Sequence, residues 1–114
     1  MQGTTVDLSA INGIGHGDGG VANGARLVAF TEAVMGTDDG RLDAERRALC
    51  AVLSPAAFVD VCAVIGMFNI VDRIADAIGI PLDAPLAMMS ADVRAELDLE
   101  RFASSANSRR VLDD

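Results

Sequence analysis

The sequence predicts an all-α protein, a small helical bundle that forms oligomers, and three observations favour it. Apolar residues recur at helical spacing in four segments after residue 24. Aromatic residues make up only 4% of the chain, with no Trp or Tyr, so small aliphatic side chains that suit closely packed helices must fill the core. Hydrophobic residues make up 51% of 114 residues, which is more apolar surface than a monomer of this size readily buries.

Composition divides the chain into three segments. Residues 1–24 are a glycine-rich N-terminal segment that holds seven of the eleven glycines. Residues 25–103 form the predicted helical domain. Residues 104–114 form a C-terminal tail that is expected to fray.

Two helices are expected in the first part of the helical domain. The first covers residues 25–35, can end at Gly36, and places four apolar side chains at helical spacing: Leu27, Phe30, Val34 and Met35. A turn at residues 37–40 follows. Asp43 can then cap a helix over residues 44–53, whose buried side is expected to comprise Ala48, Leu49, Val52 and Leu53.

The longest predicted helix covers residues 55–79. Ser54 and Pro55 are a strong start signal, because Ser is a favoured N-cap residue and Pro fits the first turn. Gly79 closes the helix. A linker over residues 83–89 leads to a last helix that Ser90 can cap and whose apolar side comprises Val93, Leu97 and Phe102.

Four polar residues form a stripe on the last third of the long helix: Asn69, Asp72, Arg73 and Asp76. Their spacing of i, i+3, i+4 and i+7 places them on one face. One interpretation is a solvated face on which Asn69 or Asp72 pairs locally with Arg73. The other is that the neighbouring acids hold Arg73 in a helix junction or a subunit contact.

Charge and hydropathy exclude several partners. The formal net charge is −8 and every basic residue is Arg, so we expect neither nucleic acid nor anionic membrane surfaces to bind. The longest strictly apolar run, residues 61–68, is far shorter than the ~20 residues that span a bilayer. No signal peptide is recognised, and two cysteines without a CxxC pattern favour free thiols in the cytoplasm.

The glycine-rich segment contains a formal G-x-G-x-x-G match at Gly15, Gly17 and Gly20. A dinucleotide site needs this motif within a βαβ unit, and no second parallel strand is predicted downstream. His16 and Asp18 provide too few fixed ligands for a metal. We therefore expect neither a cofactor nor a metal site.

The stretch LSPAAFVDVCAVIGMFNIVDRIADAIGIPLD, residues 53–83, resembles the alkylhydroperoxidase D-like, or carboxymuconolactone decarboxylase, family. Six residues match the family pattern: Phe68, Asn69, Arg73, Ala75, Asp76 and Gly79. With the preceding helical pair, the likeness covers about residues 25–83. It implies an all-α fold and obligate oligomers built from long helices.

Catalytic members of that family carry two cysteines one helical turn apart, followed by a histidine. The thiolate attacks a peroxide and the second thiol resolves the resulting sulfenic acid. Here SAING at residues 9–13 resembles the lead-in, but Ile14 and Gly17 occupy the cysteine positions and Val21 the histidine position. The resemblance therefore implies a non-catalytic, degenerate member.

Two other functions stay open at this point. An enzyme of the family could be a thiol peroxidase that uses Cys50, next to Arg46 and Arg47, or a decarboxylase-like catalyst around Arg73 and Asp76. Cys62, on the apolar part of the long helix, is most simply a core residue. The third function is a module that binds a small apolar ligand in a pocket lined by Phe58, Val61, Ile65 and Met67.

Overall fold

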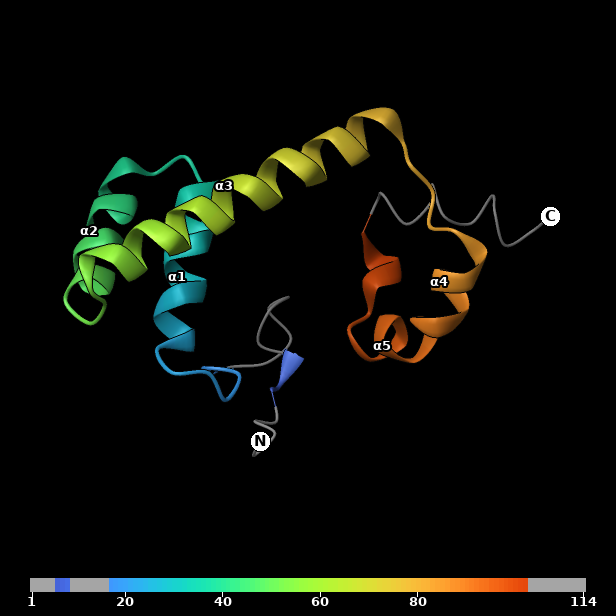
Figure 1. Ribbon diagram of the computed structural model, residues 1–114, viewed down its shortest axis with the longest axis horizontal. Helices are drawn as coiled ribbons and strands as arrows, with labels where there is room; N and C mark the ends of the chain where they lie inside the picture. The colour runs from blue at the N-terminus through green and yellow to red at the C-terminus, as the bar shows by residue number, and fades with distance from the viewer. Residues whose placement is uncertain (1–5, 9–16, 103–114) are drawn as a thin grey trace. The chain divides into compact units, whose positions relative to one another are not determined.

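The computed structural model describes residues 6–8 and 17–102, which form five α-helices and the 3₁₀ helix η2, without a strand (Figure 1). The predicted all-α class is therefore confirmed for this part of the chain. The chain divides into two compact units, Met1–Gly66 and Met67–Asp114, and helix α3 contributes to both. The predicted segment boundaries after residues 24 and 103 stay predictions.

A tight turn precedes the first helix and explains part of the glycine content. The carboxylate of Asp18 accepts a hydrogen bond from the Gly20 backbone N–H at 2.9 Å, and Gly20 has a positive φ of 75°. A Cβ atom at Gly24 would lie 1.9 Å from the Asp18 carbonyl oxygen. Only glycine therefore allows the turn to approach the helix this closely. His16 and Ile14 lie outside the described residues.

Helix α1 spans Gly24–Met35 and ends at Gly36, as predicted. Helix α2 spans Asp39–Cys50, so it begins and ends earlier than the predicted range of 44–53. The carboxylate of Asp38 caps it by accepting a hydrogen bond from the Arg41 backbone N–H at 2.9 Å. The choice of Asp43 as the cap was therefore wrong, because the earlier aspartate captures the free N–H groups first.

Helix α3 spans Pro55–Ile78, and both of its predicted ends are confirmed. The Ser54 hydroxyl accepts a hydrogen bond from the Ala57 backbone N–H at 3.2 Å, as an N-cap does. At the other end, Gly79 adopts a left-handed φ of 71° and its N–H donates to the Ala75 carbonyl at 2.9 Å. Such a conformation satisfies the last carbonyl groups of a helix.

The core of the first unit lies where α1 and α2 pack together. The buried hydrophobic residues in the described part of this unit are Phe30, Ala33 and Leu49. The Phe30 ring also meets the Phe58 ring of α3, with centroids 5.5 Å apart and planes inclined at 52°. Val52, which was predicted to lie on the buried side of the second helix, is exposed in the single chain, and so are Val34 and Met35 of the first helix.

The region after α3 differs from the sequence prediction. The predicted linker contains helix α4, Ala84–Met89, and the predicted last helix is divided into α5, Ala91–Glu96, and η2, Leu99–Arg101. The Asp83 carboxylate caps α4 by accepting from the Leu86 backbone N–H at 2.9 Å. The Ser90 hydroxyl caps nothing and donates to the Leu86 carbonyl at 2.6 Å. Asp98 has a left-handed φ of 49°, which interrupts the helix.

Candidate functional site

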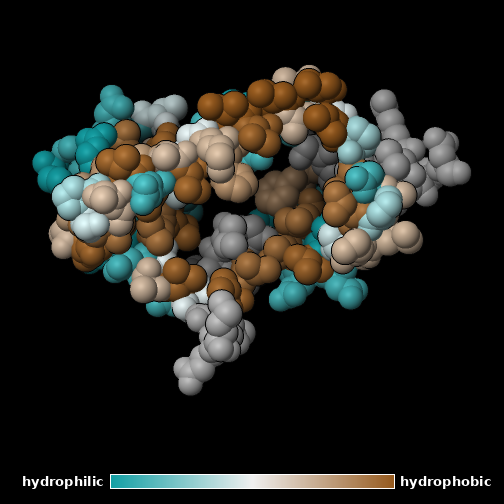
Figure 2. All heavy atoms as spheres, viewed as in Figure 1, coloured by the Kyte–Doolittle hydropathy of each residue, from teal (hydrophilic) through white to brown (hydrophobic). Residues whose placement is uncertain are grey.

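Helix α3 has an apolar surface along its length, and none of its residues is buried in the single chain. Hydrophobic side chains are exposed along much of this helix (Figure 2). Five of them recur at alternating intervals of three and four residues: Val64, Met67, Val71, Ile74 and Ile78. Each is between 52% and 69% exposed. We call this set the α3 seam.

The α3 seam has the spacing of a helix that pairs with another helix. Intervals of three and four match the a and d positions of a heptad, with β-branched Val64, Val71 and Ile78 at the a positions. At 3.6 residues per turn, the centre of the seam lies about 130° around the helix from the centre of Phe58, Val61 and Ile65. Those three are half-buried and lie on the side of α3 on which Phe58 meets Phe30. The seam and these three residues therefore lie on different sides of the helix.

The residues predicted to line a ligand pocket do not share one environment. Phe58, Val61 and Ile65 are half-buried and the Phe58 ring meets Phe30, whereas Met67 is 55% exposed and belongs to the α3 seam. Three of the four residues are half-buried and the fourth is on the surface. They do not support the predicted apolar pocket.

Helix α3 also meets a test of length and composition for crossing a membrane. An 18-residue window within it has a mean hydropathy of 1.6, and none of that window is buried. The longest uninterrupted apolar run does not reveal this property, because Asp60 and Asn69 limit that run to residues 61–68. A helix that is buried between subunits has the same composition, so length and composition do not distinguish the two environments.

The polar stripe lies opposite the α3 seam, and its arginine is paired locally. The Arg73 Nε–H donates to the Asn69 side-chain oxygen at 3.0 Å. Within the described part of the chain, no carboxylate oxygen lies within 4.0 Å of the Arg73 guanidinium. The structure agrees with the first interpretation, in which Arg73 pairs locally with Asn69. The acids beside Arg73 do not hold it.

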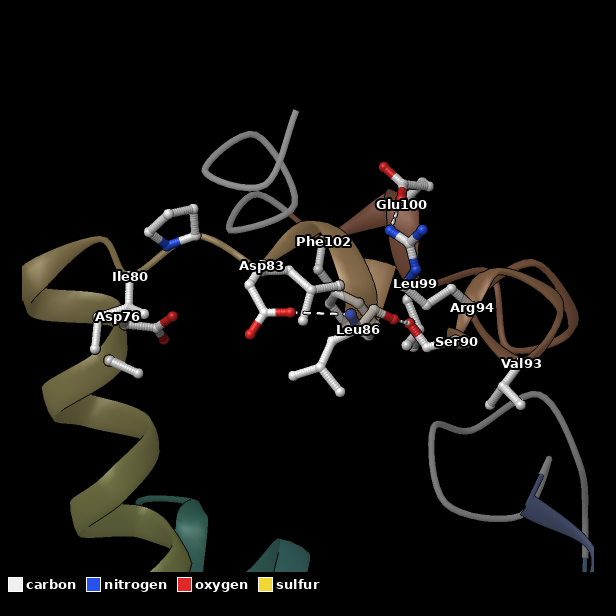
Figure 3. A pocket seen from close by; sticks show the side chains of 13 residues that line it. Asp76, Ile80, Asp83, Leu86, Ser90, Val93, Arg94, Leu99, Glu100 and Phe102 are labelled. Carbon is white, nitrogen blue, oxygen red and sulfur yellow. Dashed lines mark hydrogen bonds and ion pairs between the residues drawn. The ribbon is translucent and has the colours of Figure 1, made fainter. Parts of the chain in front are cut away.

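Asp76 lies at a cavity that belongs entirely to the second unit (Figure 3). The cavity has a volume of about 720 Å³ and is formed by the end of α3, by α4, α5 and η2, and by their connections. Arg73 is not among its lining residues. The two candidates for a decarboxylase-like centre, Arg73 and Asp76, are therefore not brought together around one pocket.

Sequence reasoning missed Arg94, which is the charged residue held most firmly at this cavity. Its side chain is 18% exposed; Nη1 lies 3.2 Å from the Glu100 carboxylate, and Nη2 donates to the Ala87 carbonyl at 3.1 Å. The Nε atom is buried and has no partner among the described residues. One signal was available, because Arg94 is the single basic residue between positions 74 and 100.

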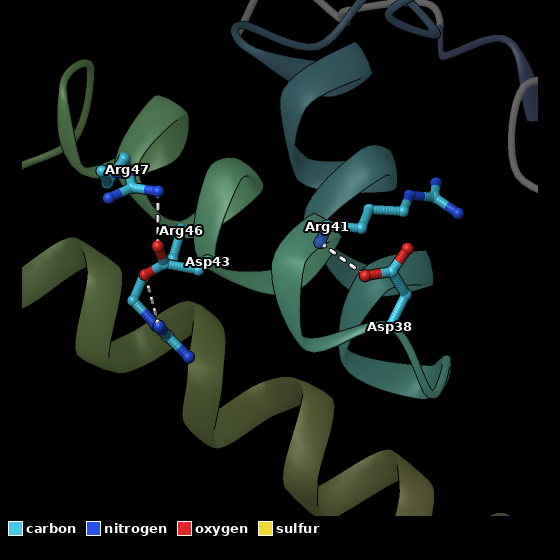
Figure 4. A network of polar contacts seen from close by, with 5 residues as sticks. All are labelled: Asp38, Arg41, Asp43, Arg46 and Arg47. Carbon is cyan, nitrogen blue, oxygen red and sulfur yellow. Dashed lines mark hydrogen bonds and ion pairs between the residues drawn. The ribbon is translucent and has the colours of Figure 1, made fainter.

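Cys50 is exposed at the last residue of α2, and the arginines before it are already paired (Figure 4). Arg46 Nη1 lies 3.2 Å from one Asp43 carboxylate oxygen, and Arg47 Nη2 pairs with the other. This arrangement does not support an activated thiol. Cys62 is exposed in the single chain and is not the core residue that was predicted.

The protein is expected to show no peroxide turnover that depends on its thiols. Hydrogen peroxide and an organic peroxide should be consumed no faster by the wild-type chain than by the double variant Cys50→Ala, Cys62→Ala, because neither thiol has an activating partner. A coupled dithiol-oxidation assay measures the difference. Activity that Cys50→Ala alone abolishes would contradict this prediction and favour the single-cysteine enzyme.

Groups of three or more metal-ligating side chains do not occur within residues 6–8 and 17–102. Comparison of the chain with protein-family models, with curated proteins and with solved structures finds no match.

Proposed function

We propose that this chain is a non-catalytic, self-assembling helical protein, in which two copies pair through the α3 seam. The observation that carries the proposal is that the five seam residues are more than half exposed on a 24-residue helix with no buried residue. Burying one aliphatic side chain of this size is worth about 1.5–3 kcal/mol relative to full exposure. A second copy offers the same seam, and two-fold homodimers are the commonest soluble assemblies.

The resemblance to the alkylhydroperoxidase D-like family supports the same function. It rests on residues 53–83, which form most of α3 and the turn after it, and it implies a helical bundle of that family's type. Ile14, Gly17 and Val21 occupy the positions of the redox residues. In this proposal the chain is a degenerate relative that keeps the assembling helix and lacks the peroxidase chemistry.

A second copy covers the α3 seam better than a bilayer does. Helix α3 carries four charged residues: Asp60, Asp72, Arg73 and Asp76. A charged side chain near the centre of a bilayer costs about 2.5–3.5 kcal/mol on insertion scales. In a dimer, the polar stripe stays in water because it lies opposite the seam. A cytoplasmic location, compatible with two free thiols, is part of the proposal.

Light scattering coupled to size-exclusion chromatography tests the proposed assembly. At micromolar concentration, the mass should be at least twice the 11.8 kDa of one chain. A well-folded monomer across the accessible concentrations would contradict the proposal. Flotation of the protein with liposomes, together with a monomer in detergent, would favour the membrane-spanning alternative.

A further inference from the structure

The cavity of the second unit has the size and the walls of a small-molecule site. Its volume of about 720 Å³ lies within the usual range for ligand pockets, about 300–1,000 Å³. Most of its lining is apolar, including Ile80, Leu82, Leu86, Val93, Leu99 and Phe102. A ligand that fits these walls has a hydrophobic body.

Two of the ionised groups at the cavity are engaged by the protein itself. The Arg94 guanidinium contacts Glu100 and the Ala87 carbonyl, and its Nε atom is buried where no ligand can reach it. The Asp83 carboxylate accepts the Leu86 backbone N–H as the N-cap of α4. An anion entering the cavity would therefore meet an arginine that is already paired, together with the carboxylates of Asp76, Asp83 and Glu100.

Among the carboxylates at the cavity, Glu100 pairs with Arg94 and Asp83 caps α4, whereas Asp76 has neither role. It forms neither an ion pair nor a hydrogen bond with any residue that the structure describes. Figure 3 shows its carboxylate extending from α3 toward the side on which Asp83 and Leu86 lie. Asp76 is exposed at the cavity, so its carboxylate is open to a ligand, and an ammonium group beside it would form a charge-assisted hydrogen bond.

The position of Asp76 at the end of α3 strengthens this preference. The C-terminal end of a helix dipole carries partial negative charge, and cations are stabilising there. The last turn of α3 contains no basic residue. The end of α3, Asp76 and Asp83 therefore all contribute negative potential at the cavity.

We propose that this cavity binds a small organic cation with an apolar body, such as a hydrophobic amine. The ammonium group lies against the Asp76 carboxylate, and the body lies against Leu86, Val93 and Phe102. This inference does not depend on the pairing of α3 seams, because every lining residue belongs to the second unit and none is a seam residue.

Calorimetric titration of the wild-type protein with hexylammonium tests the proposal, with methylammonium and hexanoate as the comparison ligands. Hexylammonium should bind. Methylammonium lacks the apolar body, so its dissociation constant should be larger than that of hexylammonium by a factor of about ten or more. Hexanoate should not bind. Amide shifts in the NMR spectrum should be confined to residues near Asp76, Leu86 and Val93, which separates this site from the α3 seam.

Asp76→Asn, which removes only the charge, should weaken hexylammonium binding about tenfold or more. The variant should fold, because an acid in the last turn of a helix is unfavourable. Asp72→Asn is the matched control: Asp72 lies one turn earlier on α3 and is not part of the cavity lining, so its loss should leave the affinity unchanged. Equal affinities for wild type and Asp76→Asn, tighter binding of hexanoate, or no binding at millimolar hexylammonium would each overturn the proposal.

Discussion

Ile74→Glu is expected to convert the assembled protein into folded monomers. Ile74 is 52% exposed in the single chain, so a glutamate there reaches water and leaves the fold of one chain intact. In a symmetric dimer the substitution occurs twice, and each carboxylate would be buried without a partner, which costs several kcal/mol. About 2.8 kcal/mol already raises the dissociation constant about a hundredfold. Light scattering reads the mass, and circular dichroism reads the helix content.

The matched control introduces the same residue on the other face of α3. Asn69→Glu places a glutamate on the polar stripe, one helical turn before Arg73, where it can pair with the guanidinium. This variant should keep both the mass and the helix content of the wild type. If Ile74→Glu stays assembled, or if both variants dissociate equally, the α3 seam is not the interface.

Position 74 separates assembly from folding better than positions closer to the first unit. Ile65 was an obvious target from the sequence, because it lies in the most apolar part of the long helix. In the structure Ile65 is half-buried on the side of α3 that faces away from the seam. A charge at Ile65 would therefore disturb the packing of a single chain, and the loss of assembly would be indirect.

The ends of the long helix were predictable because each is fixed by local chemistry. Ser54 satisfies a free N–H group at the start, and Gly79 adopts a left-handed conformation at the end. These effects involve residues no more than a few positions apart, so the sequence contains all of the information. The same logic was available for Asp83 and Pro85, which begin α4, but the shortness of that helix concealed it.

The functional surfaces were less predictable because they depend on which side of a helix is covered. Hydropathy identified α3 as apolar but not which of its side chains a single chain covers; Phe58, Val61 and Ile65 are half-buried, whereas the seam residues are exposed. The cavity was missed for a different reason. Asp76, Leu86 and Arg94 come from three helices, and their meeting depends on the turns at Gly79 and Ser90. No single spacing in the sequence contains that information.

Leu49→Ala should lower the free energy of unfolding by about 2–5 kcal/mol, the range measured for truncating a fully buried leucine. Leu49 is 0% exposed and is, with Phe30 and Ala33 of α1, one of the buried hydrophobic residues in the described part of the first unit. So small a core has few side chains that can move into the cavity left by the truncation. Val52→Ala is the control, because Val52 lies three residues later, is 42% exposed and should cost less than about 1 kcal/mol. Denaturant unfolding at one fixed protein concentration compares the variants without a contribution from assembly differences. Equal losses for the two variants would mean that the packing of α1 against α2 does not determine the stability of the first unit.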